Sequence, residues 1–361
     1  MITETFPNEV KETYFIPPIK KKDSVTNKSI PSREKLITMW RNRQHKIKIL
    51  DKKINEENQQ FTDSAVTEEN DIINELCEES VQWLKYNQAP WELVLEHWNK
   101  CYTIRVKDLK QFEEKNLATI FDKWQLFKHP QGYELIALDF ENMNVSKINL
   151  NYDTWFNFFT IVKQNTNINH KNNNLNVMVQ QIEDKEMNED AKAAIICQLL
   201  SHFLPPRKVS VCGKNSYKAS IGAAKDSMIK HANVPGDMLR LRFETKKHAE
   251  TLKIPVQPYI ITVGDYKTAI ESYVCVDETL YKVNTTIEAI DICFKAFHVF
   301  QLQYPGASEH LWILMQRGIY GFSTKWDPNI SFIAHILKKL QDRTKMLQEQ
   351  IALNNSIESI K

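Results

Sequence analysis

Glycine scarcity constrains the fold of this chain more than any other feature of its sequence. Only 8 of the 361 residues are glycine, where average usage would supply about 25. Folds that bind nucleotides on glycine-rich loops need several glycines at fixed spacing, and neither GxGxxG nor GxxxxGK[ST] occurs. The sequence therefore argues against a Rossmann or P-loop domain. Its length suggests two or three structural units, or one large domain with extensions.

The apolar pattern predicts an α+β fold that is mainly helical with a small sheet. Helical spacing of apolar residues runs through 72–84, 91–102, 117–124, 152–162, 191–204, 287–302 and 308–322. Strands are predicted at 133–140, 258–265 and 273–283, with Gly132 marking a turn before the first. We expect residues 207–253 to begin as a loop and to become helical near Ala223.

Composition shifts divide the chain into three predicted parts. Residues 1–70 form an N-terminal arm with a basic and an acidic block, and a helix inside it is predicted from a cap at Ser32. Residues 71–327 form a globular α+β region, which could itself divide into a helical part (71–125) and a mixed part (126–327). Residues 328–361 form a C-terminal helix with a heptad-like pattern.

The heptad-like positions of this last helix are Ile333, Leu337, Leu340, Thr344, Leu347 and Ile351. Such a pattern suits self-association through residues 330–351, and it equally suits a helix that docks onto its own domain.

Charge is segregated along the chain, although the net charge is only +2. Residues 20–53 hold twelve Lys or Arg against three acids, and residues 54–79 hold nine acids and neither Lys nor Arg. A second basic stretch, residues 207–253, holds eleven Lys or Arg against four acids. These segments predict contact with nucleic acid, and pairing with the acidic block is the alternative. The candidate contact residues are Lys20, Lys21, Lys22, Arg41, Arg43, Lys46, Arg207, Lys208 and Lys214.

Three acids carry an alternative, enzymatic interpretation. Asp139 and Asp265 close predicted strands, and Asp291 follows as a third carboxylate, with Asp277 and Glu309 as alternatives for that third position. Acids at strand ends can converge on divalent cations, as metal-dependent phosphoryl transfer requires. The alternative function is thus a nuclease- or transposase-like enzyme, or its inactive descendant. Aspartates at strand ends are also common turn formers.

The cysteines and the chain start indicate a reduced, intracellular setting. No two of the six cysteines lie closer than 15 residues, which excludes CxxC metal knuckles and redox pairs. His97 and Cys101 stand four apart, which favours a packed thiol beside a histidine over a metal pair. Cys212 lies among cations that would activate it, or is a plain loop cysteine. We expect no metal, no cofactor, no signal peptide and no membrane span, and a location in nucleus or cytoplasm.

Three segments resemble the recurring motifs of a known family. The first is WQLFKHPQGYELI at 124–136 followed by Asp139-Phe140. The second is AIDICFKAFHVF at 289–300 followed by Tyr304-Pro305, and the third is 311–320 with Trp326-Asp327. Together, over about residues 81–327, the chain is similar to a multi-copy set of uncharacterised insect and fish proteins.

Some members of that set are named sterile-alpha-motif-domain-3-like. The resemblance implies no activity, substrate or catalytic residue, and its multi-copy spread suggests descent from a mobile element. This chain shows no sterile alpha motif. The motif aromatics suit a core rather than a cofactor site, and they are Trp124, Tyr133, Phe140, Phe294, Phe297, Phe300 and Trp312.

These observations together predict an intracellular, non-enzymatic interaction protein, nuclear if Lys20–Lys22 act as an import signal. Its predicted partners are nucleic acid through the basic segments, a second copy through the last helix, and an unidentified protein.

Overall fold

A computed structural model describes residues 15–16, 33–34, 77–111, 117–166, 173–207, 209–212, 215–267 and 269–342. The chain divides into two compact units, Met1–Leu76 and Cys77–Lys361. In the first unit, β1 (Phe15–Ile16) pairs antiparallel with β2 (Arg33–Glu34). Arg33 and Glu34 are thus extended where the sequence predicted the start of a helix. The rest of that predicted helix lies outside the described residues.

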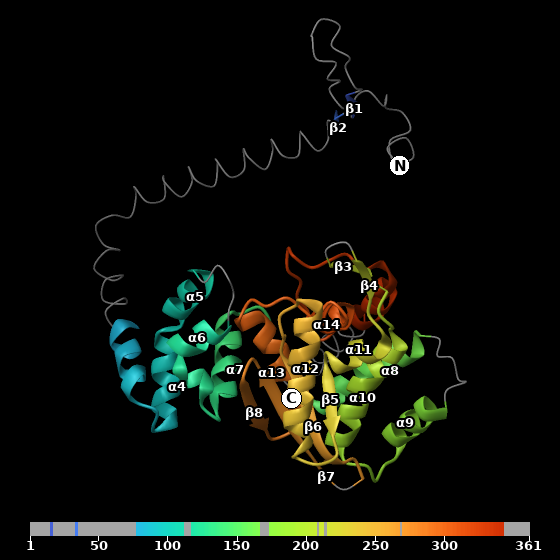
Figure 1. Cartoon of the computed structure of the whole chain (residues 1–361), viewed down its shortest axis with the longest axis horizontal. Helices are drawn as coiled ribbons and strands as arrows, with labels where there is room; N and C mark the ends of the chain where they lie inside the picture. Colours follow the sequence, from blue (N-terminus) through green and yellow to red (C-terminus); the bar gives the residue numbers. More distant parts are fainter. Residues whose placement is uncertain are drawn as a thin grey trace, which may run out of the picture. The chain divides into compact units, whose positions relative to one another are not determined.

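The second unit is mainly helical with one small mixed sheet, which confirms the predicted fold class (Figure 1). Its helices before the sheet are residues 77–86, α4 (Trp91–Lys100), α5 (Tyr102–Gln111), α6 (Leu117–Lys123), η2 (Gln125–Lys128), α7 (Gly132–Asn142), α8 (Tyr152–Gln164), α9 (Asn173–Glu183) and α10 (Glu189–Phe203). The later helices are α11 (Ile221–Asp226), α12 (Asp237–Leu252), α13 (Thr286–Val299), α14 (Glu309–Gly318), η3 (Ser331–Ile333) and residues 334–342.

The sheet has the strand order β5-β6-β7-β8. Its strands are β5 (Ile229–Ala232), β6 (Tyr259–Asp265), β7 (Ala269–Val276) and β8 (Thr279–Val283). β5 runs parallel to β6, whereas β6, β7 and β8 pair antiparallel. The segment predicted as one strand, 273–283, is a hairpin that turns at Asp277, whose φ is +52°.

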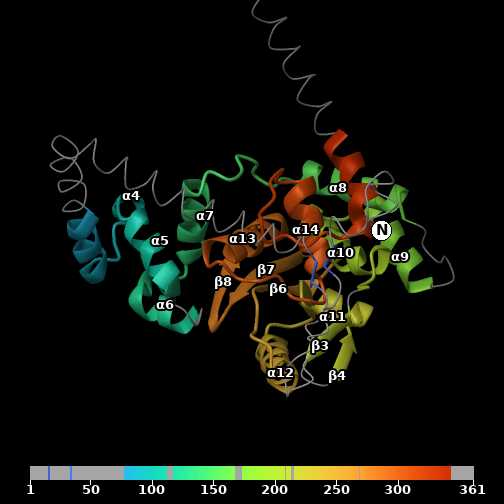
Figure 2. The same ribbon diagram turned by 90° about the horizontal axis from the view of Figure 1, so that it is seen from above.

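Each face of the sheet is covered by helices, and the strand pattern explains why. Along β6, Tyr259, Ile261 and Val263 pack with α12, while Ile260 belongs to the larger core on the opposite face. Alternate side chains of a strand point to opposite faces, so a strand buried on both sides is apolar throughout. Figure 2 shows α12 on one side of the sheet and α13 and α10 on the other.

Residues 133–140 are helical, so the strand predicted there is wrong. They belong to α7, in which Leu135, Ile136, Asp139 and Phe140 are buried at helical spacing. A short apolar run fits either period, so the sequence pattern alone was ambiguous. The helix begins at Gly132, and glycine is needed at this position because a Cβ atom there would lie 2.7 Å from the carbonyl oxygen of Phe127.

The second basic stretch contains more structure than its sequence predicted. In place of a loop, β3 (Val209–Cys212) and β4 (Asn215–Lys218) form an antiparallel hairpin, so Cys212 ends a strand. Ala223 lies in α11 as predicted, but β5 then intervenes before α12.

The described part of the last helix docks onto its own unit. Ile333, Ile336, Leu337 and Leu340 are buried in the main core. Contact with α14 is so close that a Cβ atom at Gly318 would lie 2.6 Å from Leu340 Cδ1. Docking is therefore the interpretation that fits residues 333–340. The remaining heptad positions, Thr344, Leu347 and Ile351, lie outside the described residues.

Five cysteines, namely Cys77, Cys101, Cys197, Cys275 and Cys293, are buried free thiols. Burial raises the pKa of Cys101 to about 11 and that of Cys197 to about 12. Of the helices in the described ranges, none is long and apolar enough to cross a membrane.

Candidate functional site

The structure places one of the nine predicted nucleic-acid contacts. Arg207 is exposed, and its guanidinium carbon lies 4.6 Å from the ring centre of Phe332. The other eight lie outside the described residues, and they are Lys20, Lys21, Lys22, Arg41, Arg43, Lys46, Lys208 and Lys214.

Asp139 lies at the centre of a buried polar cluster rather than at a strand end. Arg105 donates through Nε to Oδ2 at 3.1 Å and through a terminal nitrogen to Oδ1 at 2.5 Å. The indole nitrogen of Trp98 donates to Oδ1 at 3.0 Å, and Arg105 also donates to the thiol of Cys101. Burial raises the pKa of Asp139, although Arg105 and Trp98 act against that rise. The hydrogen-bonding capacity of the Asp139 carboxylate is therefore used by donors on α4 and α5.

The other two predicted acids have separate surroundings. Asp265 is exposed at the end of β6, where its side chain accepts from the backbone N–H of Lys267. Asp291 lies within α13 and bonds to Lys295 Nζ and to the hydroxyl of Tyr320, both at 2.7 Å. Across the described ranges, no three His, Cys, Asp or Glu side chains gather in a way that could hold a metal ion. Asp139, Asp265 and Asp291 therefore do not form a shared cation site.

The His97/Cys101 pair is likewise taken up by packing. His97 stacks on Trp83 and its Nδ1 lies 3.1 Å from the hydroxyl of Ser80. The thiol of Cys101 is the acceptor for Arg105.

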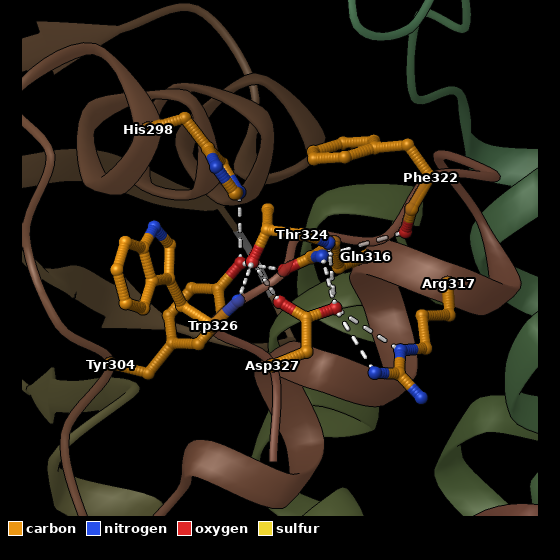
Figure 3. A network of polar contacts seen from close by, with 8 residues as sticks. All are labelled: His298, Tyr304, Gln316, Arg317, Phe322, Thr324, Trp326 and Asp327. Atoms are coloured by element: carbon orange, nitrogen blue, oxygen red, sulfur yellow. Dashed lines mark hydrogen bonds and ion pairs between the residues drawn. The ribbon is translucent and has the colours of Figure 1, made fainter. Parts of the chain in front are cut away.

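A second polar network joins α13, α14 and the loop that follows α14 (Figure 3). The hydroxyl of Tyr304 lies 2.8 Å from His298 Nε2 and donates to Gln316 Oε1 at 2.9 Å. The Gln316 amide in turn donates to Asp327 Oδ2 at 2.8 Å. Because Tyr304 donates to Gln316, its oxygen is free to accept, which assigns the neutral His298 proton to Nε2. The hydrogen bonds thus run in one direction, from His298 to Asp327.

Asp327 is the acceptor on which this network converges. Besides Gln316, it accepts two bonds from Arg317, at 3.2 and 3.1 Å, and bonds from both the backbone and the hydroxyl of Thr324. Burial alone would raise the pKa of Asp327, but the hydrogen bonds from Thr324, Gln316 and Arg317 outweigh burial and lower it. The loop from Phe322 to Asp327 is therefore tied to α14 through this carboxylate, and the Gln316 amide also donates to the carbonyl oxygen of Phe322.

Burial also shifts the pKa of His298, and here it lowers the pKa because the protonated form carries the charge. Its pKa falls to about 4, because burial penalises the cation more than the Asp327 charge stabilises it. His298 is therefore neutral at physiological pH.

This fixed loop exposes a tryptophan. Trp326 is 80% exposed, and its neighbour Asp327 has a side chain only 4% exposed. Figure 3 shows the indole directed away from Asp327. The backbone N–H of Trp326 donates to the hydroxyl of Thr324, and Lys325 Nζ lies 4.7 Å from the ring centre. A large apolar ring is thus presented to solvent from a rigid base.

The sequence marks Trp326-Asp327 and Tyr304 as parts of motifs, but it reveals neither the hydrogen-bond network nor the exposure of the Trp326 ring. One local signal indicated that Trp326 would be exposed. Its neighbours are the charged residues Lys325 and Asp327, followed by the helix-breaking Pro328. The partners His298 and Gln316 come from other helices, and no local pattern announces them.

No protein-family model matches the chain, and no curated protein or solved structure shows significant similarity to it. Membership of the multi-copy insect and fish family therefore stays a prediction.

Proposed function

We propose that this chain is a non-enzymatic interaction protein and that it presents Trp326 to a protein partner. The observation that carries the proposal is the 80% exposure of a tryptophan next to a buried, fully bonded aspartate. Tryptophan is the residue type most enriched at the energetic centres of protein interfaces, because it buries a large area and has few rotatable bonds.

The hydrogen bonds of Asp327 support this role through preorganisation. A loop that is ordered before binding loses less conformational entropy when the partner arrives. Thr324, Gln316 and Arg317 supply that order without covering the indole. The hydrogen bonds of the fold thus order the loop before the partner binds. Burial of the Trp326 ring against the partner then adds to the affinity.

The state of the buried polar groups supports a binding role over a catalytic one. Asp139, Asp291 and Asp327 each accept from donors of their own fold. A general acid or base must reach a proton on its substrate. Carboxylates whose hydrogen bonds are all made within the fold are suited to stabilising the structure instead.

The test compares Trp326→Ala with Tyr86→Ala in the full chain. Tyr86 is the matched control because it is 75% exposed and also follows a lysine, Lys85, whose Nζ lies 5.5 Å from its ring centre. Proteins retained by the wild type and by Tyr86→Ala, but lost with Trp326→Ala, are then purified. Their dissociation constants are measured against each variant.

We expect Trp326→Ala to weaken the interaction roughly 30-fold or more, which corresponds to about 2 kcal/mol. Its unfolding curve should match that of the wild type, because an exposed ring contributes little to stability. Equal affinity of the two variants for every purified partner would refute the role of Trp326.

A further inference from the structure

An apolar groove lies between α4, α7 and α13, within the second unit. Its volume is about 380 Å³. The lining residues are Leu95, Glu96, Asn99, Tyr133, Glu134, Ala137, Leu138, Glu141, Glu288 and Ile292. Apart from buried Ile292, its apolar members are only partly buried, so their faces remain open to a ligand.

The groove follows the surface of a helix. Glu134, Ala137, Leu138 and Glu141 are spaced i, i+3, i+4 and i+7 along α7, so they share one face. Leu95 on α4 and Ile292 on α13 border that face. A helix is about 10–12 Å across with its side chains, so a groove of this size admits the anchor side chains of a helix rather than the whole helix.

Negative charge surrounds this apolar floor. Four of the ten lining residues are glutamates and none is Lys or Arg. Lys100 pairs with Glu96 at 2.6 Å. Among the described residues, no Lys or Arg lies at ion-pair distance from Glu134, Glu141 or Glu288. Nearby donors hold two of these three carboxylates in place without neutralising them.

Those donors are neutral groups. The indole of Trp91 donates to Glu134 at 2.8 Å. The backbone N–H of Asn284 donates to Glu288 at 2.8 Å, at the capped start of α13. The effect on Tyr133 is consistent with a negative groove. Burial raises the pKa of Tyr133, and the charges of Glu288 and Glu134 raise it further.

We infer that this groove binds a basic amphipathic helix of a protein partner. Apolar side chains of that helix, spaced i, i+3 or i+4, would rest on Leu95, Ala137 and Leu138, while its Lys or Arg residues would face the glutamates. Phosphate groups would be repelled, so nucleic acid is not the occupant. The inference goes beyond the proposed role of Trp326, since it uses other residues and names the chemistry of the partner.

The test uses synthetic peptides and the full chain. The probe is a fluorescent helical peptide with leucines at one face and lysines elsewhere. Two matched peptides accompany it: a scrambled one with the same composition but no apolar face, and one in which glutamates replace the lysines. Binding is followed by fluorescence anisotropy at two salt concentrations, with circular dichroism as a check on the fold of each variant.

We expect the amphipathic basic probe to bind, the other two to bind at least tenfold more weakly, and affinity to fall as salt rises. Glu141→Gln should weaken binding by about threefold to fivefold, as befits an exposed ion pair. Leu138→Ser should weaken it independently of salt. Glu183→Gln is the control, because Glu183 is an exposed glutamate on α9 that is paired with Lys163.

Equal binding of the scrambled peptide would reduce the site to general charge attraction and overturn the inference. Unchanged affinity after Glu141→Gln and Leu138→Ser would overturn it too. Trp326→Ala should leave probe binding unchanged, so the groove and the Trp326 proposal can fail separately.

Discussion

Arg105 and Asp139 show how a charged pair is accommodated inside this molecule. Both side chains are almost fully buried, at 1% and 3% exposure, and Arg105 also lies over the ring of Trp98. Desolvation of such a pair is costly, and the bidentate hydrogen bonds and the indole donor offset that cost.

Removing one member of this pair should harm stability far more than removing both. We expect Arg105→Met or Asp139→Leu alone to lower the free energy of unfolding by about 3–5 kcal/mol, because each leaves an unpaired buried charge. The double variant should recover much of that loss. Urea unfolding of the four proteins measures the coupling, and purely additive losses would contradict this account.

His298 makes stability depend on pH. Its pKa is about 4 in the folded chain and near 6.5 ordinarily, so the unfolded chain binds the proton first as pH falls. The contribution of His298 to the free energy of unfolding should therefore decrease from pH 6.5 down to pH 4 and level off below, by about 3 kcal/mol for this group.

Unfolding by urea at several pH values between about 7 and 4 measures this slope. His298→Gln should make it shallower, since glutamine can still donate to Tyr304 but does not titrate, while burial also lowers the pKa values of His202, His231 and His310 and leaves part of the slope in place. Exposed His335 provides the matched control, His335→Gln. A slope in His298→Gln that equals the slope of the wild type would contradict the contribution of His298.

At this scale the sequence predicted which residues were unusual but not what they bond to. Asp139 and Asp291 were singled out for catalysis, and both lie in ion pairs instead. Arg105 stands 34 residues from Asp139 and Tyr320 stands 29 residues from Asp291. These two partners depend on helix packing, which a local pattern does not contain, whereas Lys295 stands four residues after Asp291 on the same helix and its ion pair could have been predicted from that spacing. The motif aromatics were easier, because apolar size alone favours burial.

At the scale of helices and strands, Gly132 shows a conflict between local preference and packing. Alanine is the better helix former, yet Gly132→Ala should destabilise by about 1–3 kcal/mol, because its Cβ atom would meet the carbonyl oxygens of Phe127 and Leu126 at 2.7 and 2.9 Å. Gly222→Ala in α11 is the control, since its nearest neighbour is at 3.7 Å. That variant should be neutral or slightly stabilising. Thermal unfolding compares the two, and equal shifts would refute the steric reason.

Elements with one strong period were predicted correctly, and the misses have physical reasons. α8, α10 and α13 carry long apolar faces and were predicted near their observed bounds. β5 was missed because it has four residues, with only Ile229 and Ala232 buried. Its pairing with β6 spans about thirty residues. Parallel pairing leaves no local turn signal of the kind that marks a hairpin.

At the scale of the whole molecule, part of the charge of the second basic segment, residues 207–253, is already paired within the fold. In the second segment, Arg240 pairs with Asp237 and Glu244, and Arg242 and Lys246 both pair with Glu278. Nucleic-acid contact, which remains a prediction, should therefore not rely on Arg240, Arg242 or Lys246, and residues 20–53 are the segment that we test for it.

A titration with generic DNA and RNA tests this prediction. We expect binding at low salt that weakens steeply as salt rises, and its loss after deletion of residues 1–53. Arg207→Ala should have a much smaller effect. Binding that survives the deletion, or that is absent at low salt, would contradict the role assigned to the arm.

The buried thiols of the second unit make its unfolding chemically visible. A thiol reacts with alkylating reagents as its thiolate, so burial and a raised pKa suppress the reaction in the folded state. Cys101 on the helical side and Cys197 and Cys293 behind the sheet are all protected in this way. The rate of alkylation at each of these cysteines therefore reports how often the part of the core around it opens.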